Sequence, residues 1–375
     1  MKSSKEFQTA SPSLSCNCKP ACFCPDAWHY FPNFDILILR IVRVESTEQS
    51  GIIEQYIDKE KGDKNHMTEY DLAQGLADLM QWGKIESVEN AEMADSEQGY
   101  SGAKILRKRL ILQNGTERTI IFKRSDLKER CAMVHLTRQK QCLPVSFSND
   151  TVSDTQEWIA MEDLGLQKHH DPTDIKWLSK VAHSLSKIHI KNMDKGREMS
   201  WLPTADESYW NTVTSTLSLS HMEKEIADNN NFAAHFEKYM PKLYAKAKLF
   251  AGEMTELCRE SGCMTLTHGD LQTPDGSHIY DCGGEPRIID FGFCRYAPFY
   301  IDLAGWFSEK NLVLYYYELQ KSGYELSYSD FKERVISASR YNGFIYLYPS
   351  LMAYKRGDTA KLLQTLSIIL HGNTK

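Results

Sequence analysis

The pattern of apolar and polar positions predicts a β-rich region in the first half of the chain. Short stretches of apolar and β-branched residues indicate strands at residues 85–88, 104–113, 118–124 and 157–162. Asn114-Gly115, between the second and third of these strands, is a strong hairpin signal. A helix is expected after the third strand, because helical spacing relates Glu129, Met133, Leu136 and Thr137. We therefore expect a small lobe that consists mainly of strands.

The pattern becomes helical after residue 172. Along residues 174–190, apolar side chains fall on one helical stripe formed by Ile175, Leu178, Val181, Leu185 and Ile188. Residues 206–260 and 301–373 have similar amphipathic patterns, and between them two short apolar runs flank Gly283-Gly284 and predict a hairpin. We therefore expect a larger helical lobe, joined to the first by a connector near residues 163–172.

The first part of the chain is less regular. Residues 1–30 contain Ser, Pro and Cys in a pattern typical of a poorly ordered leader. Residues 36–44 predict a strand, residues 52–58 a helix, and residues 69–82 a helix whose apolar face carries Leu72, Leu76, Leu79 and Met80. We expect the small lobe to span residues 31–163 and the helical lobe to span residues 164–375.

Composition and charge exclude some classes of function. Of the 375 residues, 42% are hydrophobic and 25% are charged, as in an ordinary soluble globular protein. The formal net charge of -6 argues against a nucleic-acid partner, because nucleic-acid-binding domains are usually basic. No apolar run approaches the roughly 18 residues of a membrane span, and no signal peptide is evident at the N-terminus. We therefore predict a cytoplasmic protein that does not bind membranes.

Four of the ten cysteines cluster in the leader, at Cys16, Cys18, Cys22 and Cys24. Such a cluster could hold zinc, although its spacing is tighter than that of most zinc sites. The alternative is a reduced leader without metal, which the flanking Ser and Pro residues favour. The other six cysteines are scattered and are expected to be buried thiols.

Two aspartates in the segment 268–292 carry the clearest chemical signal. Asp270 follows a His-Gly pair, and Asp290 precedes a Phe-Gly pair. Either motif alone also fits a plain turn. The predicted hairpin between them, however, would bring Asp290 beside the loop that contains Asp270. Because neighbouring carboxylates repel each other unless a cation lies between them, the pair indicates a metal site of the kind used in phosphoryl transfer.

Lys123 is the candidate cation upstream. Apolar neighbours on its predicted strand should direct it inward, and a buried lysine is costly without an anion. Glu129, at the start of the next helix, is the expected carboxylate partner, with Asp126 and Glu117 as nearby alternatives. The competing interpretation is a surface lysine beside Arg124.

Two further segments suit a nucleotide. Gly99 and Gly102 lie between predicted strands, where glycines allow the backbone to approach phosphates, although an ordinary hairpin turn also explains them. Met161 and Asp163 lie at the end of the last strand of the small lobe, where backbone groups can contact an adenine edge. That segment is also explained as a simple connector between lobes.

Together these residues resemble the aminoglycoside phosphotransferase / choline kinase-like family. The matching motifs are Lys123, Met-Glu-Asp-Leu-Gly at 161–165, His-Gly-Asp at 268–270, Ile-Asp-Phe-Gly at 289–292 and Asp-Leu-Ala at 302–304, and the resemblance covers roughly residues 85–373. It implies an α+β, bilobal protein-kinase-like fold. It also implies transfer of the γ-phosphate of ATP or GTP to a hydroxyl of a small molecule, such as an aminoglycoside-like antibiotic or an amino alcohol.

The resemblance assigns roles in catalysis to three aspartates. Asp270 would be the catalytic base, Asp290 would bind Mg²⁺, and Asp302 would hold the catalytic loop in place. The motif that ends at His189 also resembles the family, in which this histidine is structural.

The same resemblance implies the nucleotide contacts. Lys123 would bind the α/β-phosphates with Glu129 as its partner. Gly99 and Gly102 would lie over the phosphates, and residues 161–163 would form the adenine-binding hinge.

The chain departs from the family at the expected second metal ligand. Where the family has Asn five residues after the catalytic base, this chain has Asp275. Counting back from the following strand would place Ser277 there instead. Asp275 is the preferred ligand, because Mg²⁺ binds carboxylate oxygens well.

Two alternative functions remain open. A pseudokinase that binds nucleotide without turnover is favoured only by the missing Asn. A protein kinase is disfavoured, because Asp290 and Asp302 are too close in sequence to enclose an activation loop.

Overall fold

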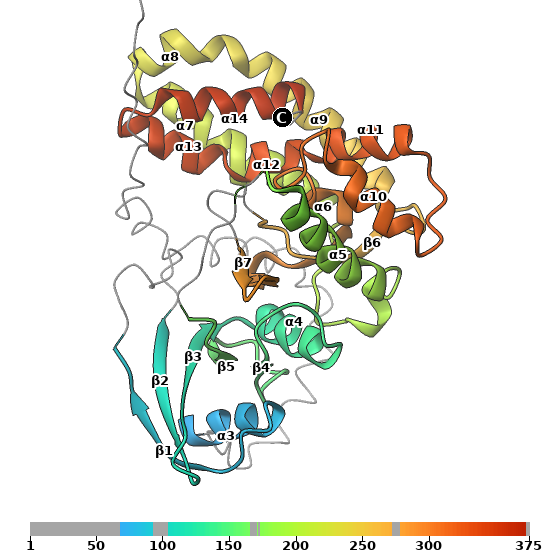
Figure 1. Cartoon of the computed structure of the whole chain (residues 1–375). Helices are drawn as coiled ribbons and strands as arrows, with labels where there is room; N and C mark the ends of the chain where they lie inside the picture. The colour runs from blue at the N-terminus through green and yellow to red at the C-terminus, as the bar shows by residue number, and fades with distance from the viewer. Residues whose placement is uncertain (1–67, 93–103, 166–170, 172, 272–277, 373–375) are drawn as a thin grey trace, which may run out of the picture.

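The protein has two lobes, a small one built on a sheet and a larger helical one (Figure 1). The computed structural model describes residues 68–92, 104–165, 171, 173–271 and 278–372. This architecture confirms the expected α+β, bilobal fold. The predictions for residues 1–30, 36–44 and 52–58, including the cysteine cluster, lie outside the described residues.

The small lobe contains a five-stranded antiparallel sheet in the order β1-β2-β3-β5-β4. Its strands are β1 (Ile85–Asn90), β2 (Ile105–Leu112), β3 (Glu117–Ser125), β4 (Ser146–Phe147) and β5 (Glu157–Glu162). The predicted turn at Asn114-Gly115 joins β2 to β3, and Gly115 adopts the positive φ of 77° that such a turn favours. The four strands expected from the apolar pattern are therefore confirmed.

Two helices flank this sheet (Figure 1). α3 (Glu69–Leu79) begins with a capping box between Thr68 and Asp71, and it buries Leu72 and Leu76 in the core of the small lobe. Leu79, expected on the same face, is 51% exposed at the last position of the helix. α4 (Leu127–Arg138) contributes buried residues to the core of the helical lobe, so it connects the two lobes.

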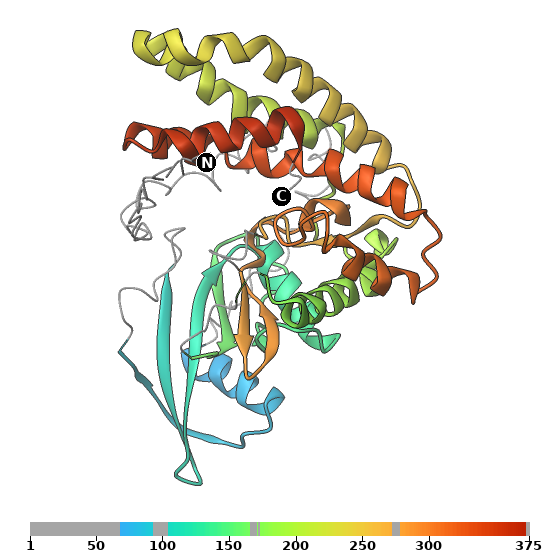
Figure 2. The ribbon, with the colours of Figure 1, turned by 45° about the horizontal axis from the view of Figure 1, so that its top comes forward.

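The helical lobe begins with α5 (Ile175–Asn192), whose stripe of apolar residues is buried as expected from Leu178 to Ile188. Ile175, in the first turn, is 50% exposed. The chain continues through α6 (Glu207–Thr214), a short π-helix η4 (Ser215–Leu219), α7 (Ser220–Asp228), α8 (Asn230–Phe236) and α9 (Met240–Leu257). Figure 2 shows α7, α8 and α9 in an outer layer against the C-terminal helices.

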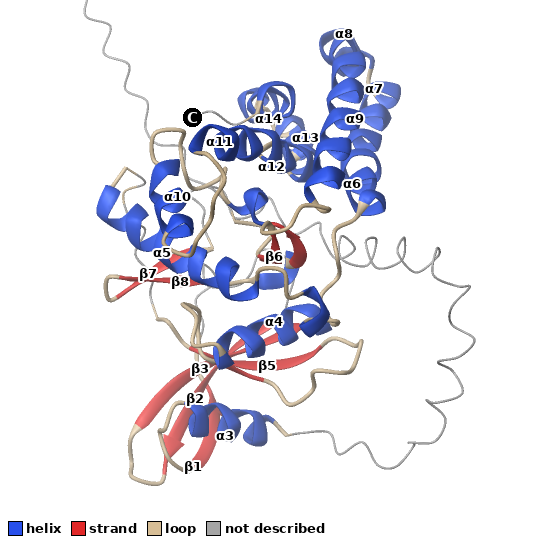
Figure 3. Ribbon diagram, turned by 90° about the vertical axis from the view of Figure 1, so that its right-hand side faces the viewer, coloured by secondary structure: helices blue, strands red, loops and turns tan. Residues whose placement is uncertain are grey.

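The C-terminal part adds α10 (Leu312–Gln320), α11 (Tyr328–Ala338), α12 (Arg340–Ile345), α13 (Leu347–Lys355) and α14 (Thr359–His371). Helix α14 packs against α12 and α13, and α10 packs against α5. Figure 3 shows these helices on the side of the lobe away from the small lobe's sheet. Within the described ranges, no helix is both long enough and apolar enough to cross a membrane.

Two short two-stranded sheets lie between the helices and the small lobe (Figure 3). β6 (Met264–Thr267) pairs with β9 (Arg295–Pro298), and β7 (Ile279–Cys282) pairs with β8 (Glu285–Ile288). The second pair is the hairpin predicted around Gly283-Gly284, and both glycines have positive φ. The segments after β6 and β8 meet where the side chain of His268 contacts the carbonyl oxygen of Ile289, which places the two motif aspartates in one region.

Candidate active site

The loop after β6 carries the His-Gly-Asp motif in a conformation that requires glycine. Gly269 has φ 78°, and a Cβ atom at this position would lie 2.4 Å from the carbonyl oxygen of Phe293. No side chain fits that space, and non-glycine residues rarely adopt this backbone conformation. Gly269 therefore allows the loop to turn tightly against the segment that follows Asp290.

Asp302 binds the backbone of this loop. Its carboxylate accepts hydrogen bonds from the backbone N–H groups of His268 at 2.7 Å and Gly269 at 2.9 Å. It also contacts Nε2 of His189 at 3.1 Å, and Nδ1 of His189 lies 2.6 Å from the hydroxyl of Tyr315. All of these groups are buried. This geometry is consistent with the positioning role expected of Asp302 and the structural role expected of His189.

His268 fixes the other side of the loop. Its Nε2 lies 2.7 Å from the carbonyl oxygen of Ile289, and its Nδ1 accepts a hydrogen bond from the backbone N–H of Asp270 at 3.2 Å. Burial lowers the pKa of this imidazole to about 4, so the neutral ring with its proton on Nε2 satisfies both contacts. His268 therefore connects the two motif segments without adding charge.

Asp270 presents a carboxylate at the end of this loop. Burial raises the pKa of Asp270 to about 6, while His278 and a hydrogen bond from Tyr346 act in the opposite direction. The Tyr346 hydroxyl donates to Oδ1 of Asp270 from the far end of α12. Asp270 is thus an ionised carboxylate at neutral pH that already accepts an O–H hydrogen bond.

Asp290 lies where β8 ends and has an unusual backbone conformation. Its φ of 64° and ψ of 66° place it in the left-handed region, which aspartate visits only occasionally. Such a strained position is common at functional sites. One carboxylate oxygen lies 2.6 Å from Nζ of Lys123, although the two residues are 167 positions apart in sequence.

Lys123 connects both lobes at this point. Its Nζ lies 2.6 Å from Oε1 of Glu129 on α4 and 2.6 Å from Oδ1 of Asp290. Burial alone would lower the pKa of the Lys123 ammonium, but the charges of Asp290 and Glu129 outweigh it and raise the pKa. Burial alone would likewise raise the pKa of Asp290, whereas Lys123 lowers it. The predicted inward lysine is therefore a buried cation held between two carboxylates.

The alternatives to Glu129 are engaged elsewhere. Asp126 accepts the backbone N–H of Glu129 as the N-cap of α4 and pairs with Lys128 at 3.3 Å. Glu117 lies at the other end of β3, 3.8 Å from Arg109. Of these three acidic residues of the small lobe, Glu129 is thus the one that pairs with Lys123.

His278 joins the two motif aspartates and was not predicted from the sequence. Its Nδ1 lies 2.8 Å from the carbonyl oxygen of Asp270, and its Nε2 lies 3.7 Å from Oδ2 of Asp290. The ring of His268 packs next to it, with the centroids 5.5 Å apart. One imidazole therefore spans the space between both aspartates, which places them on neighbouring walls of one site.

The connector after β5 is held by an ion pair. Arg107 on β2 binds the carboxylate of Asp163 with Nε–Oδ2 at 2.8 Å, and the backbone N–H of Gly165 donates to the same carboxylate at 2.9 Å. Met161 lies within β5, paired with β3 and β4. The side chain of Asp163 thus stabilises the conformation of the connector. Gly99, Gly102, Asp275 and Ser277 lie outside the described residues.

The donor set suits a magnesium ion that also binds phosphates. Among the residues in the described ranges, no three or more His, Cys, Asp or Glu side chains are grouped to hold a metal by themselves. Mg²⁺ usually takes one or two protein carboxylates and completes its shell with phosphates and water. Asp290, whose side chain is 36% exposed, offers one such carboxylate.

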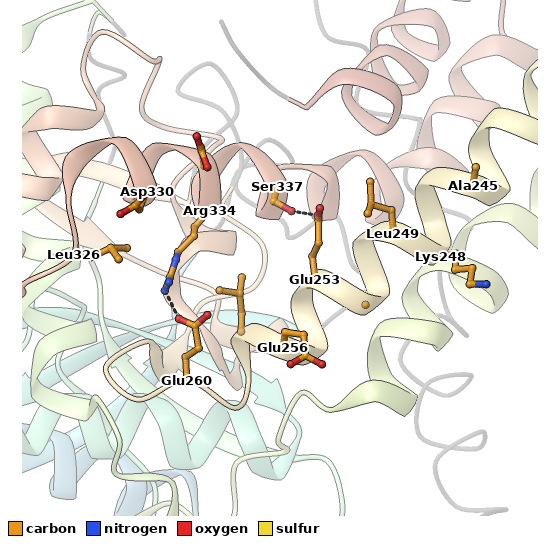
Figure 4. A pocket seen from close by; sticks show the side chains of 13 residues that line it. Ala245, Lys248, Leu249, Glu253, Glu256, Glu260, Leu326, Asp330, Arg334 and Ser337 are labelled. Carbon is orange, nitrogen blue, oxygen red and sulfur yellow. Dashed lines mark hydrogen bonds and ion pairs between the residues drawn. The ribbon is translucent and has the colours of Figure 1, made fainter.

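A separate groove of about 860 Å³ lies between α9 and α11 (Figure 4). Its lining includes an ion pair between Arg334 and Glu260 and a hydrogen bond from Ser337 to Glu253. None of the predicted site residues lines it. The groove is therefore distinct from the site around Asp270 and Asp290.

No family model matches the chain, and no curated protein matches it in sequence. Among solved structures, a choline kinase from Cryptosporidium parvum Iowa II aligns with a TM-score of 0.50 and 12% identity over 76% of this chain and 88% of that chain. A spectinomycin phosphotransferase in complex with ADP and spectinomycin aligns with a TM-score of 0.45 and 11% identity over 79% of this chain and 93% of that chain. A macrolide 2'-phosphotransferase from Brachybacterium faecium aligns with a TM-score of 0.41 and 11% identity over 80% of this chain and 98% of that chain. The likeness to the choline kinase shows that the protein-kinase-like fold is shared.

Proposed function

We propose that this protein transfers the γ-phosphoryl group of ATP or GTP to a hydroxyl of a small molecule. The observation that supports this most directly is the position of Lys123, 2.6 Å from both Glu129 and Asp290. A buried cation flanked by two carboxylates can exchange one of them for a phosphate without losing its counter-charge. The second carboxylate, Glu129, would then keep the ammonium oriented.

We infer the remaining nucleotide contacts from the sequence motifs. Asp290 would hold Mg²⁺, with Asp275 as the second ligand, and the ion would neutralise charge on the phosphates. Gly99 and Gly102 would contribute the glycine-rich segment that approaches the phosphates. The backbone of residues 161–163 contacts the adenine, and the boundary between the lobes falls there.

Asp270 is the proposed catalytic base. Its carboxylate accepts an O–H hydrogen bond from Tyr346, which is the interaction that an acceptor hydroxyl needs. Burial raises the pKa of Asp270 to about 6, which is closer to neutrality than that of an ordinary aspartate. A base with this pKa is ionised at pH 7 and takes up a proton more readily than a fully solvated carboxylate.

The acceptor class is proposed from the fold. One solved structure that shares the fold is named a choline kinase, so the first acceptors to test are amino alcohols. Aminoglycoside-like antibiotics form the second group. Both carry a hydroxyl to receive the phosphoryl group.

The test combines binding and turnover with purified full-length protein. Mg²⁺ with ATP or GTP should raise the melting temperature by mass action, and one nucleotide should be consumed when an acceptor pool is added. Lys123→Met should weaken the nucleotide-dependent shift, whereas Lys84→Met, the same change at an exposed lysine, should not. Asp270→Asn should bind nucleotide and lose turnover.

Two results would contradict the proposal. If neither nucleotide raises the melting temperature, the nucleotide site is wrong. If nucleotide binds but is never consumed, and Asp270→Asn behaves like the parent protein, the chain is a nucleotide-binding pseudokinase instead.

A further inference from the structure

Tyr346 presents its hydroxyl to the carboxylate that is proposed to receive the acceptor's proton. The phenol oxygen donates a hydrogen bond to Oδ1 of Asp270. In the proposed reaction, the hydroxyl bonded to this carboxylate is the one that attacks phosphorus. We propose that Tyr346 is an internal phosphoryl acceptor, modified by the protein's own active site when no small-molecule acceptor is present. This inference rests on the proposed function.

The backbone holds Tyr346 in this place. It lies at the junction between α12 and α13, where its N–H donates to the carbonyl of Asn342 at 3.1 Å. Its own carbonyl accepts from the N–H of Ser350 at 3.0 Å. A hydroxyl fixed by two helices is positioned as a bound substrate would be, and such positioning contributes strongly to rate.

Tyr346 is also accessible in the way that an acceptor must be. Its side chain is partly exposed, whereas the core residues of the lobe are buried. Tyr341, one turn earlier, is 1% exposed, and its hydroxyl donates to the carbonyl of Gly269 at 3.0 Å instead of to a carboxylate. Tyr341 within α12 therefore contacts the backbone of the loop, whereas Tyr346 at the end of α12 contacts the proposed base.

The chemistry balances without a further reagent beyond the nucleoside triphosphate. The phenol proton passes to the Asp270 carboxylate, and the phenol oxygen forms a bond to the γ-phosphorus. The bond between that phosphorus and the β,γ-bridging oxygen breaks, and the nucleoside diphosphate leaves. The products are phosphotyrosine at position 346 and a protonated Asp270, which returns its proton to solvent.

The experiment uses the full chain with Mg²⁺ and γ-³²P-labelled ATP or GTP, without an acceptor. Incorporation should approach one phosphate per chain, at a rate that does not depend on protein concentration, because base and acceptor belong to the same molecule. Trypsin cleaves after Arg340 and Lys355, and fragment ions of peptide 341–355 should place the phosphate on Tyr346.

Matched variants separate the possible results. Tyr346→Phe keeps the ring and should lower incorporation at least about tenfold, in line with the loss of a positioned nucleophile. Tyr348→Phe, on the same peptide, should label as the parent protein does. Asp270→Asn should abolish labelling. Melting temperatures of all variants establish that each is folded.

The inference is overturned if Tyr346→Phe labels as well as the parent, or if the phosphate lies on another residue. It is also overturned, with the proposed function intact, if the parent consumes nucleotide in an Asp270-dependent manner but carries no phosphotyrosine. If nucleotide neither binds nor is consumed, both the inference and the proposed function fail.

Discussion

The substitution Asp302→Asn tests whether the loop that carries Asp270 depends on one buried carboxylate. Asp302 accepts hydrogen bonds from the backbone N–H groups of His268 and Gly269 and contacts His189. An asparagine offers a single acceptor oxygen in place of two. If that oxygen faces His268 and His189, the amide group faces the N–H of Gly269 and leaves it without an acceptor.

The magnitude follows from these contacts. An unsatisfied buried donor costs about 1–3 kcal/mol of unfolding free energy. The two remaining hydrogen bonds lose the assistance of a charged acceptor, which is worth roughly 1 kcal/mol each. We therefore expect the folded state to lose about 3–5 kcal/mol, which lowers the melting temperature by on the order of 10 °C. Turnover should fall about 100-fold, because Asp270 moves with the loop.

The assay is thermal unfolding followed by nucleotide turnover at a temperature where the variant remains folded. Asp358→Asn is the matched control, since Asp358 caps α14 at the surface and Asn caps helices equally well. If Asp302→Asn melts within about 2 °C of the parent and keeps full activity, Asp302 does not hold the loop.

Three further predictions follow from the same site. The acidic limb of the pH profile of kcat/KM should have an apparent pKa near 6, because Asp270 must be ionised and burial raises its pKa to about 6. Tyr346→Phe removes a hydrogen bond that lowers the pKa of Asp270, so it should move this limb to higher pH. A limb near pH 4 in the parent protein would contradict the role of Asp270. The folded-state pKa of Asp270 lies above its ordinary value, so ionisation of Asp270 lowers the free energy of unfolding as pH rises through about 4 to 6. In denaturant titrations, Asp270→Asn should therefore have a free energy of unfolding up to about 3 kcal/mol higher than the parent at pH 7.5, and this difference should vanish below about pH 4. Gly269→Ala should destabilise the fold by about 2–4 kcal/mol, because the new Cβ would clash with Phe293. Gly283 has a similar positive φ but open space around it, so Gly283→Ala should cost only about 1 kcal/mol. Equal effects of the two variants in thermal unfolding would show that the contact with Phe293 is unimportant.

The fold was largely predictable because its elements carry strong local patterns. Strand β5 (Glu157–Glu162) and the hairpin at Asn114-Gly115 lie where alternation and turn chemistry indicate them. The exposure of Leu79 and Ile175 was not predictable, because helical spacing defines a face but not where the covering neighbour ends.

The site was predictable only in part. Lys123, Glu129, Asp270 and Asp290 belong to motifs whose spacing carries information. Tyr346 contacts Asp270 across 76 positions, and no local pattern reports such a contact. Asp163 pairs with Arg107 across 56 positions, so this ion pair could not be predicted from a local sequence pattern either.

The ion pair between Lys123 and Asp290 has a thermodynamic consequence for the proposed reaction. A phosphate that binds Lys123 releases Asp290 from its counter-ion, and a divalent cation that binds Asp290 releases Lys123. Phosphate alone would leave Asp290 without its counter-ion, and the cation alone would leave Lys123 with Glu129 as its carboxylate partner, whereas both ligands together restore two charged partners to Lys123 and a cation to Asp290. Nucleotide and metal should therefore bind with positive coupling, and each should raise the affinity for the other by the same factor. We therefore expect this 2.6 Å contact to make the proposed site bind the metal–nucleotide complex in preference to either component alone.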